Sequence, residues 1–399
     1  MSEKRLNLLT MQEAMDLLEI SRSTLDRWRK DKKLPFIKIG KEVYFHKDDL
    51  QFWLRRHTQV LDSMDLSNHH DDNNCITIGY QSGTAHMWTP ILIKEFDLLA
   101  EELANIDRSR HWNIKWKNAA NGLELVEGMI TGEIQIASLG DYPILVAERL
   151  GQILPKFHPA LLAFDGKSIN GRGIAIVVPN RASVHEPSDL YQTIFSTVQN
   201  SSAGQRLKKM LASIGNIESQ VIHQEMEESL AGIINGRVQA SAMWEPYISL
   251  INYHGKGRVL FPEGMGGDYL TGVVADSNWS STNESLVIAY LKAHLRAHSI
   301  ARIYPEKAAR MIARSTGLPI VVVAQVLSRV RWDAAVYKRD LQTLKNLDSF
   351  DAVNLGQMVR NENNILFDSR FLEQAANKLR LPLLSSNHLN GDWSNELLY

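Results

Sequence analysis

The sequence contains a single cysteine, Cys75, among 399 residues. One thiol excludes intramolecular disulfides, and it excludes zinc or iron–sulfur sites built from several cysteines. The chain also lacks any run of about 18 uncharged apolar residues, the length that spans a bilayer. Its first 20 residues include acidic side chains and no small-residue cleavage site, so they do not match a secretion signal. Together these absences predict a cytoplasmic protein that does not bind membranes.

Common catalytic motifs are lacking as well. The sequence contains no Gly-x-Ser-x-Gly nucleophile elbow, no His-Glu-x-x-His metal motif and no Walker lysine loop. With 44% hydrophobic and 22% charged residues it has the composition of a globular protein, long enough for two or three domains. We therefore predict a binding protein rather than an enzyme, with no catalytic residues, no metal site and no cofactor.

Net charge is −1 overall, but it is unevenly distributed along the chain. Residues 1–60 contain 13 Lys and Arg against 9 Asp and Glu, whereas residues 61–399 contain 31 against 36. A basic end on an acidic body is expected where one end of a protein meets nucleic acid. Random scatter would produce the same imbalance, so charge alone leaves both interpretations open.

Local patterns in the basic end predict two short helices and a hairpin. Thr10 and Glu13 have capping-box spacing, which predicts a helix over about 11–19. A serine-capped, basic amphipathic helix follows over about 21–30. Residues 36–45 then alternate around a Gly-Lys turn, which is typical of a β-hairpin. Two helices with a tight turn between them match helix-turn-helix geometry, with the hairpin as a wing.

Residues 46–56 predict a third amphipathic helix that closes this mini-core. The whole module, LLTMQEAMDLLEISRSTLDRWRKDKKLPFIKIGKEVYFHKDDLQFWL within Leu8–Arg56, resembles the winged helix-turn-helix domain shared by excisionases and mercury-resistance-type (MerR) regulators. In that family the second helix enters the major groove and the wing touches backbone or minor groove. The resemblance implies contacts to double-stranded DNA from Ser21, Arg22, Ser23, Thr24, Arg27, Lys38 and Lys41.

Two further expectations concern this module. One small head binds DNA weakly alone, so we expect a homodimer or higher homo-oligomer that binds paired half-sites. The alternative is a small protein-interaction module whose charges are merely solvated.

The remainder of the chain alternates strand and helix patterns. Strands are expected at about 75–80, 113–117, 134–137, 173–178, 193–197 and 238–243, and helices at about 90–99, 122–131, 201–211 and 226–235. Such alternation predicts an α/β fold with substantial parallel sheet. In such sheets ligands bind beyond the carboxyl ends of the strands. The stretch NAANGLELVEGMITGEIQIASLGDYP, with a small-residue turn at each end, therefore predicts one wall of a ligand pocket.

Several features of this part resemble the substrate-binding proteins of ABC importers for sulfonates, taurine and nitrate, and the related thiamine-pyrimidine binders. They are IGYQ near its start, GLELVEGMITGEIQIASLGDYP, a serine-containing turn before a helix, and GIINGRVQASAMWEPY. The resemblance covers roughly residues 76–330 and implies a two-lobed, type II periplasmic-binding-protein-like domain. The implied boundaries are 1–58 for the head, 59–75 for a linker, 76–168 and 270–399 for lobe I, and 172–266 for lobe II, with hinge crossings at 169–173 and 266–271.

The same resemblance implies a pocket between the two lobes. Its candidate residues are Gln81, Ser82, Asn121, Gly122, Gly140, Asp141, Ser201, Ser202, Trp244 and Glu245. The serines and a helix N-terminus suit a sulfonate, a carboxylate or another anion, and the carboxylates could receive an ammonium group. Each candidate also has a structural interpretation: Gly140-Asp141 as a turn, Ser201-Ser202 as a helix cap and Trp244 as ordinary core.

These features lead to three hypotheses about function. The first is a one-component transcriptional regulator in which a small anionic or zwitterionic effector (a sulfonate, taurine, nitrate, a pyrimidine or a small carboxylate) modulates DNA binding. The second is an enzyme of the thiamine-pyrimidine type, whose iron site needs a cysteine-rich motif that this sequence lacks. The third is an excisionase-like architectural DNA binder without a ligand.

Overall fold

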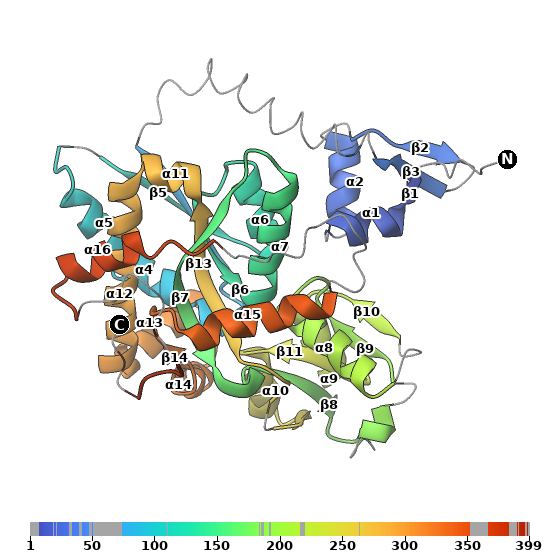
Figure 1. The fold of residues 1–399 in the computed structure, drawn as a ribbon. Helices are drawn as coiled ribbons and strands as arrows, with labels where there is room; N and C mark the ends of the chain where they lie inside the picture. The colour runs from blue at the N-terminus through green and yellow to red at the C-terminus, as the bar shows by residue number, and fades with distance from the viewer. Residues whose placement is uncertain are drawn as a thin grey trace.

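The computed structural model contains a small head and a larger body with two sheets (Figure 1). It describes residues 8–18, 20, 22–31, 34–39, 42–47, 50, 74–109, 111–182, 184, 187–190, 193–215, 220–262, 264–351, 366–382, 389, 391–395 and 397. Ser21, Lys41, most of the helix expected over 46–56 and the linker up to residue 73 lie outside these residues. In the described part of the chain, no helix combines the length and apolar character needed to cross a bilayer.

The head contains two helices and an antiparallel sheet of order β1-β3-β2. Its elements are β1 (Leu8–Thr10), α1 (Met11–Leu18), α2 (Arg22–Asp31), β2 (Ile37–Ile39) and β3 (Glu42–His46). The predicted capping box is present: Thr10 N–H donates to Glu13 Oε2 at 2.8 Å, and Glu13 N–H donates to Thr10 Oγ1 at 3.1 Å. The two predicted helices and the hairpin are confirmed, whereas β1 was not predicted.

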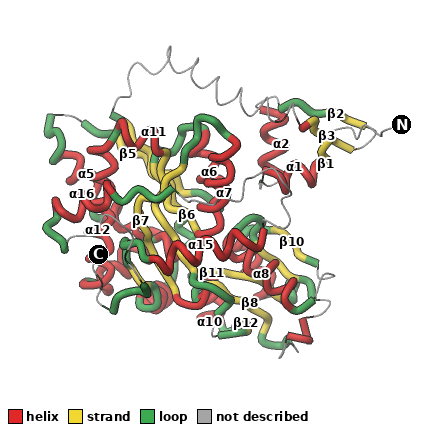
Figure 2. The backbone as a smooth tube through the Cα atoms, viewed as in Figure 1, coloured by secondary structure: helices red, strands yellow, loops and turns green. Residues whose placement is uncertain are grey.

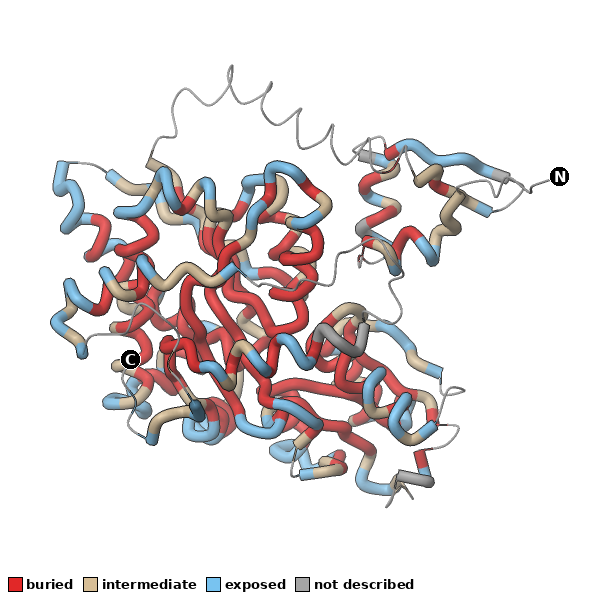
Figure 3. The backbone as a smooth tube through the Cα atoms, in the orientation of Figure 1, coloured by how far each residue is buried: buried red, intermediate tan, exposed pale blue. Residues whose placement is uncertain are grey.

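Lobe I of the body is a six-stranded mixed sheet of order β14-β7-β13-β6-β4-β5. Its strands are β4 (Cys75–Tyr80), β5 (Asn113–Asn118), β6 (Ile136–Gly140), β7 (Pro159–Ser168), β13 (Tyr269–Asp276) and β14 (Arg331–Trp332). β4 is parallel to β5 and β6, and β13 is antiparallel to β6 and β7. Every residue of β6 is buried, as expected for a strand covered on both faces (Figure 3).

Helices cover both faces of this sheet, as Figures 1 and 2 show. The early ones are η1 (Ala85–Met87), α4 (Thr89–Glu95), α5 (Leu98–Ala104), α6 (Gly122–Ile130) and α7 (Asp141–Ile153). The later ones are α11 (Ser277–Thr282), α12 (Glu284–Ile303), α13 (Pro305–Thr316), α14 (Ile320–Leu327), α15 (Lys338–Asp351) and α16 (Arg370–Lys378). α6 and α7 lie on one face, and α4, α5 and α12 lie on the other.

Lobe II is a five-stranded sheet of order β10-β9-β11-β8-β12. Its elements are β8 (Ile174–Pro179), η3 (Pro187–Leu190), β9 (Phe195–Thr197), α8 (Ser202–Ser213), β10 (Val221–His223), α9 (Met226–Ile234), β11 (Ala240–Trp244), α10 (Tyr247–His254) and β12 (Gly257–Leu260). The chain passes from lobe I to lobe II through η2 (Ile169–Gly171) and returns between β12 and β13. We propose the domain boundaries given above on this basis.

A buried lysine joins the C-terminal part of the chain to lobe I. Lys167 on β7 is fully buried, and its Nζ donates to Asp340 Oδ2 at 2.7 Å and to the Ala335 carbonyl at 2.6 Å. Trp393 Nε1 donates to the other oxygen of Asp340 at 2.6 Å. A buried charge is stable only when it is paired and hydrogen-bonded, so these tail residues belong to the core of lobe I.

Three sequence predictions need correction. The helix expected over 90–99 is two helices, α4 and α5, because Asp97 between them adopts a left-handed conformation with φ 52°. The strand expected over 134–137 begins at Ile136 and continues to Gly140. Gly140-Asp141, interpreted as a turn, is the end of β6 and the start of the 13-residue helix α7, where Pro143 in the first turn leaves no hydrogen bond unmade.

Candidate ligand cleft and nucleic-acid interface

The predicted ligand residues come from both lobes, and the fold brings most of them together. Gly140 ends β6 in lobe I, and Ser202 begins α8 in lobe II. A Cβ atom at position 140 would lie 2.8 Å from Ser202 Oγ, so the absence of a side chain at Gly140 allows this close approach. Ser202 Oγ also accepts a long bond of 3.4 Å from Tyr142 N–H across the cleft. The lobes are therefore in direct contact here.

An ion pair between Asp141 and Arg206 lies at the centre of this contact. Asp141, the first residue of α7, is fully buried, and Arg206 Nη2 on α8 donates to its Oδ2 at 2.7 Å. Arg206 Nη1 lies 3.3 Å from Asp141 Oδ1, and Tyr142 N–H donates to the same oxygen at 2.8 Å. The carboxylate therefore occupies the donors that an external anion would need. Asp141 holds the lobes together rather than facing an open pocket.

The end of β11 in lobe II forms the second contact between the lobes. Trp244 Nε1 donates to the Gly83 carbonyl at 2.8 Å, and Ala85 N–H donates to the Glu245 carbonyl at 2.9 Å. The Glu245 side chain is buried and accepts from the N–H and hydroxyl of Ser249, each at 3.0 Å. Burial raises the pKa of the Glu245 carboxyl above its usual value. Both side chains thus serve packing and closure in this arrangement.

The lobe I turns are also satisfied internally. Gln81 Nε2 donates to the Ala120 carbonyl at 3.2 Å, and Ser82 N–H donates to Asn118 Oδ1 at 2.8 Å. Asn121 caps α6 by accepting from Glu124 N–H at 3.1 Å. Gly122 packs against Pro143, where a Cβ atom would lie 2.5 Å from a ring carbon.

On the lobe II side, Ser201 is the N-cap of α8. Its Oγ accepts from Gly204 N–H at 3.0 Å and donates to the Val198 carbonyl at 2.7 Å. The capping interpretation therefore accounts for both hydrogen bonds of this hydroxyl.

The predicted DNA contacts lie on two elements of the head. Arg22, Ser23 and Arg27 are exposed on α2, Thr24 lies on the same helix, and Lys38 is exposed on β2. Ser21 and Lys41 lie outside the described residues.

Helix α2 also contacts the body, a contact that no sequence pattern predicts. Arg27 Nη2 donates to Glu127 Oε2 on α6, and Trp28 Nε1 donates to Glu127 Oε1 at 2.9 Å. The apolar cores of the head and of α6 form one continuous cluster. The helix predicted to enter DNA is therefore packed against lobe I.

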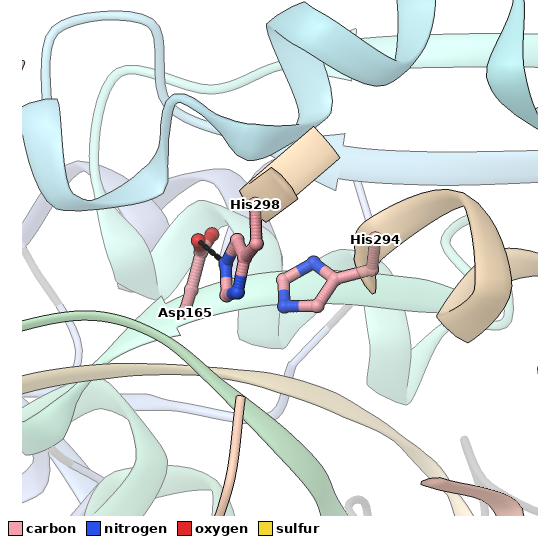
Figure 4. A group of neighbouring side chains, drawn as sticks. All are labelled: Asp165, His294 and His298. Atoms are coloured by element: carbon pink, nitrogen blue, oxygen red, sulfur yellow. Dashed lines mark hydrogen bonds and ion pairs between the residues drawn. The ribbon is translucent and has the colours of Figure 1, made fainter. Parts of the chain in front are cut away.

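The described residues contain one group of three potential metal ligands, Asp165, His294 and His298 (Figure 4). All three are fully buried, and the two histidines project from α12 toward β7. His294 Nε2 lies 2.9 Å from the Phe164 carbonyl, His298 Nε2 lies 3.1 Å from Asp165 Oδ1, and Thr89 donates to the same oxygen. These bonds join α12 to the sheet, while Asp165 Oδ2, His294 Nδ1 and His298 Nδ1 are buried without a hydrogen-bond partner among the described residues.

Burial lowers the pKa of His294 to about 4 and of His298 to about 3, and it raises the pKa of Asp165 to about 6. His86, buried beside Ser168, has its pKa lowered to about 3 by burial and by Arg206. Below pH 6.5 these histidines bind protons in the unfolded chain but stay neutral in the folded chain. The free energy of unfolding therefore decreases as the pH is lowered. Asp165 acts in the opposite direction between pH 6 and 3.8, because only the folded state keeps its proton there.

The three histidines together change the free energy of unfolding more than the single aspartate does. We therefore expect the free energy of unfolding to decrease by roughly 1–3 kcal/mol per pH unit from pH 6 toward pH 4. Urea denaturation at several pH values measures this slope. His294→Gln should flatten it, whereas His254→Gln, at an exposed position on α10, should leave it unchanged. A denaturation midpoint that is constant between pH 7 and pH 5 would contradict the prediction.

Both the head and the body are similar to known proteins. Residues 8–58 match the family model described as a helix-turn-helix domain. The chain is 25% identical over 260 residues to a putative aliphatic sulfonates-binding protein of Escherichia coli K12, covering 63% of this chain and 75% of that protein.

Solved structures extend the similarity to the fold of the body. The alkanesulfonate-binding protein SsuA from Xanthomonas axonopodis pv. citri bound to MOPS shows 20% identity and a TM-score of 0.59, over 74% of this chain and 96% of that one. The periplasmic nitrate-binding protein NrtA from Synechocystis PCC 6803 shows 13% identity and a TM-score of 0.60, over 77% of this chain and 90% of that one. The chain thus joins an N-terminal helix-turn-helix domain to a body with the fold of periplasmic binding proteins and with similarity to sulfonate-binding ones.

Proposed function

We propose that this protein is a one-component transcriptional regulator whose DNA binding responds to a small anionic or zwitterionic molecule bound by the body. Sulfonates and taurine are the leading effector class, because similarity to sulfonate-binding proteins covers most of the body. The protein acts on double-stranded DNA in the cytoplasm as a homodimer or higher homo-oligomer. It has no catalytic role in this proposal, since the relatives named above are binding proteins.

One observation carries the proposal: the helix of the head that is predicted to bind DNA contacts the body beside the cleft. Arg27 and Trp28 on α2 both bind Glu127, and Glu127 lies on α6, whose N-cap Asn121 is a predicted ligand residue. A ligand that changes the position of α6 or of lobe II therefore changes the surface against which α2 packs. Such a contact would couple ligand binding to DNA binding without a long pathway between the two sites.

The test uses the full chain and the DNA fragments that this protein binds in a selection from the genomic DNA of its source organism. Fluorescence anisotropy measures DNA affinity with and without saturating taurine, ethanesulfonate, MOPS, nitrate, a pyrimidine and acetate. At least one compound should change DNA affinity by about 5- to 150-fold, the usual range of allosteric coupling. If compounds that raise the melting temperature all leave DNA affinity unchanged, the body does not regulate the head.

A further inference from the structure

A cavity of about 390 Å³ lies where the head meets both lobes. Figure 1 shows α2 beside α6, with β10 of lobe II below them. The cavity is lined from the head by Arg22, Ser23 and Arg27, from lobe I by Asn121, Leu123, Glu124 and Glu127, and from lobe II by Val198, Gln199, His223, Gln224 and Glu225. Its volume is that of a small-molecule site, and all of its lining residues except Leu123 and Val198 have polar or charged side chains.

Arg22 provides a positive charge at this cavity. In the part of the chain that the structure describes, its guanidinium has one ionic contact, to Asp26 at 3.9 Å within the same helix, and 74% of its side chain is exposed. Arg27 differs, because Glu127 already binds it. Arg22 therefore retains donors for an anion that enters the cavity.

Glu225 provides a negative charge on the lobe II side of the same cavity. Its carboxylate accepts one long hydrogen bond, 3.4 Å from Asn121 Nδ2, which also links lobe II to lobe I. Burial raises the pKa of the Glu225 carboxyl, and the nearby carboxylates of Glu227, Glu228 and Glu124 raise it further. A cation placed beside Glu225 would relieve this repulsion.

A second space, of about 530 Å³, lies between the lobes beside Glu245, around Ile169 and Arg172. Where Gly140, Asp141 and Trp244 meet lobe II or lobe I, the Asp141–Arg206 pair, the contact of Gly140 with Ser202 and the bond from Trp244 to Gly83 close the cleft. A ligand could enter there only after the lobes part. The cavity at the mouth of the cleft can receive a ligand while the lobes stay closed.

We propose that this cavity binds a small zwitterion, with its anionic group on Arg22 and its ammonium group on Glu225, and that the bound molecule keeps α2 on the body and away from DNA. The regulatory half of this inference rests on the proposed function. Arg22 is a predicted DNA contact, so a ligand anion bound inside the cavity competes with a DNA phosphate for the same guanidinium. The effector is therefore expected to lower DNA affinity.

Two compounds that differ only in the ammonium group test the assignment. Calorimetry on the full chain compares taurine with ethanesulfonate, which has the same sulfonate and no ammonium. Taurine should bind at least about tenfold more tightly, because charge-assisted hydrogen bonds to a partly buried carboxylate are strong. Taurine should also weaken DNA binding in the anisotropy assay by about 5- to 150-fold.

Variants on the two walls locate the site. Glu225→Gln should remove the preference for taurine over ethanesulfonate, and Arg22→Ala should weaken both compounds. Glu306→Gln is the matched control, because Glu306 is a highly exposed side chain on α13 outside the cavity lining. Its affinities should equal those of the unaltered chain.

Three results would overturn the inference: equal affinity for the two compounds, binding of taurine that Glu225→Gln leaves unchanged, or no binding of taurine up to about 10 mM. The proposed function is judged separately. If another compound shifts DNA affinity while these variants have no effect on its binding, the regulator stands and the cavity assignment falls. If taurine binds as expected but no compound alters DNA affinity, the site stands and the regulator falls.

Discussion

Replacing Asp141 with alanine is expected to lower the free energy of unfolding by about 3–5 kcal/mol, the usual cost of removing one partner from a buried ion pair. Arg206 would keep a buried guanidinium whose two bonds to Asp141, at 2.7 and 3.3 Å, have no replacement. Tyr142 N–H at the start of α7 would also lose its 2.8 Å acceptor. Chemical denaturation monitored by tryptophan fluorescence measures the loss.

Two comparisons make this result specific to the pair. Glu133→Ala removes a surface partner of Lys117 at 3.8 Å, so it should cost less than about 1 kcal/mol. The double change Asp141→Leu with Arg206→Met removes both charges and should recover much of the loss, because no unpaired charge remains buried. If Asp141→Ala costs no more than Glu133→Ala, the ion pair does not hold the lobes together.

Arg22→Ala and Arg27→Ala are each expected to lower DNA affinity by about 5- to 150-fold, equivalent to about 1–3 kcal/mol per contact. Both arginines are exposed on α2, the helix predicted to enter the major groove. The salt dependence of binding should also weaken where a phosphate contact is lost, so anisotropy titrations at several salt concentrations are informative.

The Arg27→Ala substitution has two opposing effects on DNA binding. It also removes the contact with Glu127, which by itself should release the head and favour DNA binding. We expect the lost DNA contact to outweigh this release. Arg310→Ala, at an exposed surface pair with Glu306 on α13, is the control and should leave DNA affinity unchanged. Unaltered DNA binding by both α2 variants would mean that another surface meets the nucleic acid.

Local features of the fold could be predicted from the sequence because their causes are local. The Thr10–Glu13 capping box joins residues three apart, and the hairpin depends on alternation about one turn. Helix α7 was missed for a local reason too. Gly140-Asp141-Tyr142-Pro143 has the composition of a turn. Proline is common both in turns and in the first turn of a helix, so its presence does not distinguish these two structures.

The closure of the cleft could not be predicted in the same way. Asp141 and Arg206 are 65 positions apart and lie on different lobes, and Arg27 and Glu127 are 100 apart. No periodicity or spacing relates such residues before the chain is folded. The resemblance to binding proteins suggested which turns would meet, but not that the side chains of this chain would satisfy one another there.

The anchoring of Lys167 has a practical consequence for dividing this protein into parts. The sequence motifs that resemble those of binding proteins lie within roughly residues 76–330, which suggests residue 330 as a convenient place to shorten the body for study. Asp340 and Trp393, which neutralise and enclose the buried ammonium, lie beyond that point. A fragment that stops near residue 330 would carry an uncompensated charge inside its own sheet, so expression fragments of the body should extend past Trp393.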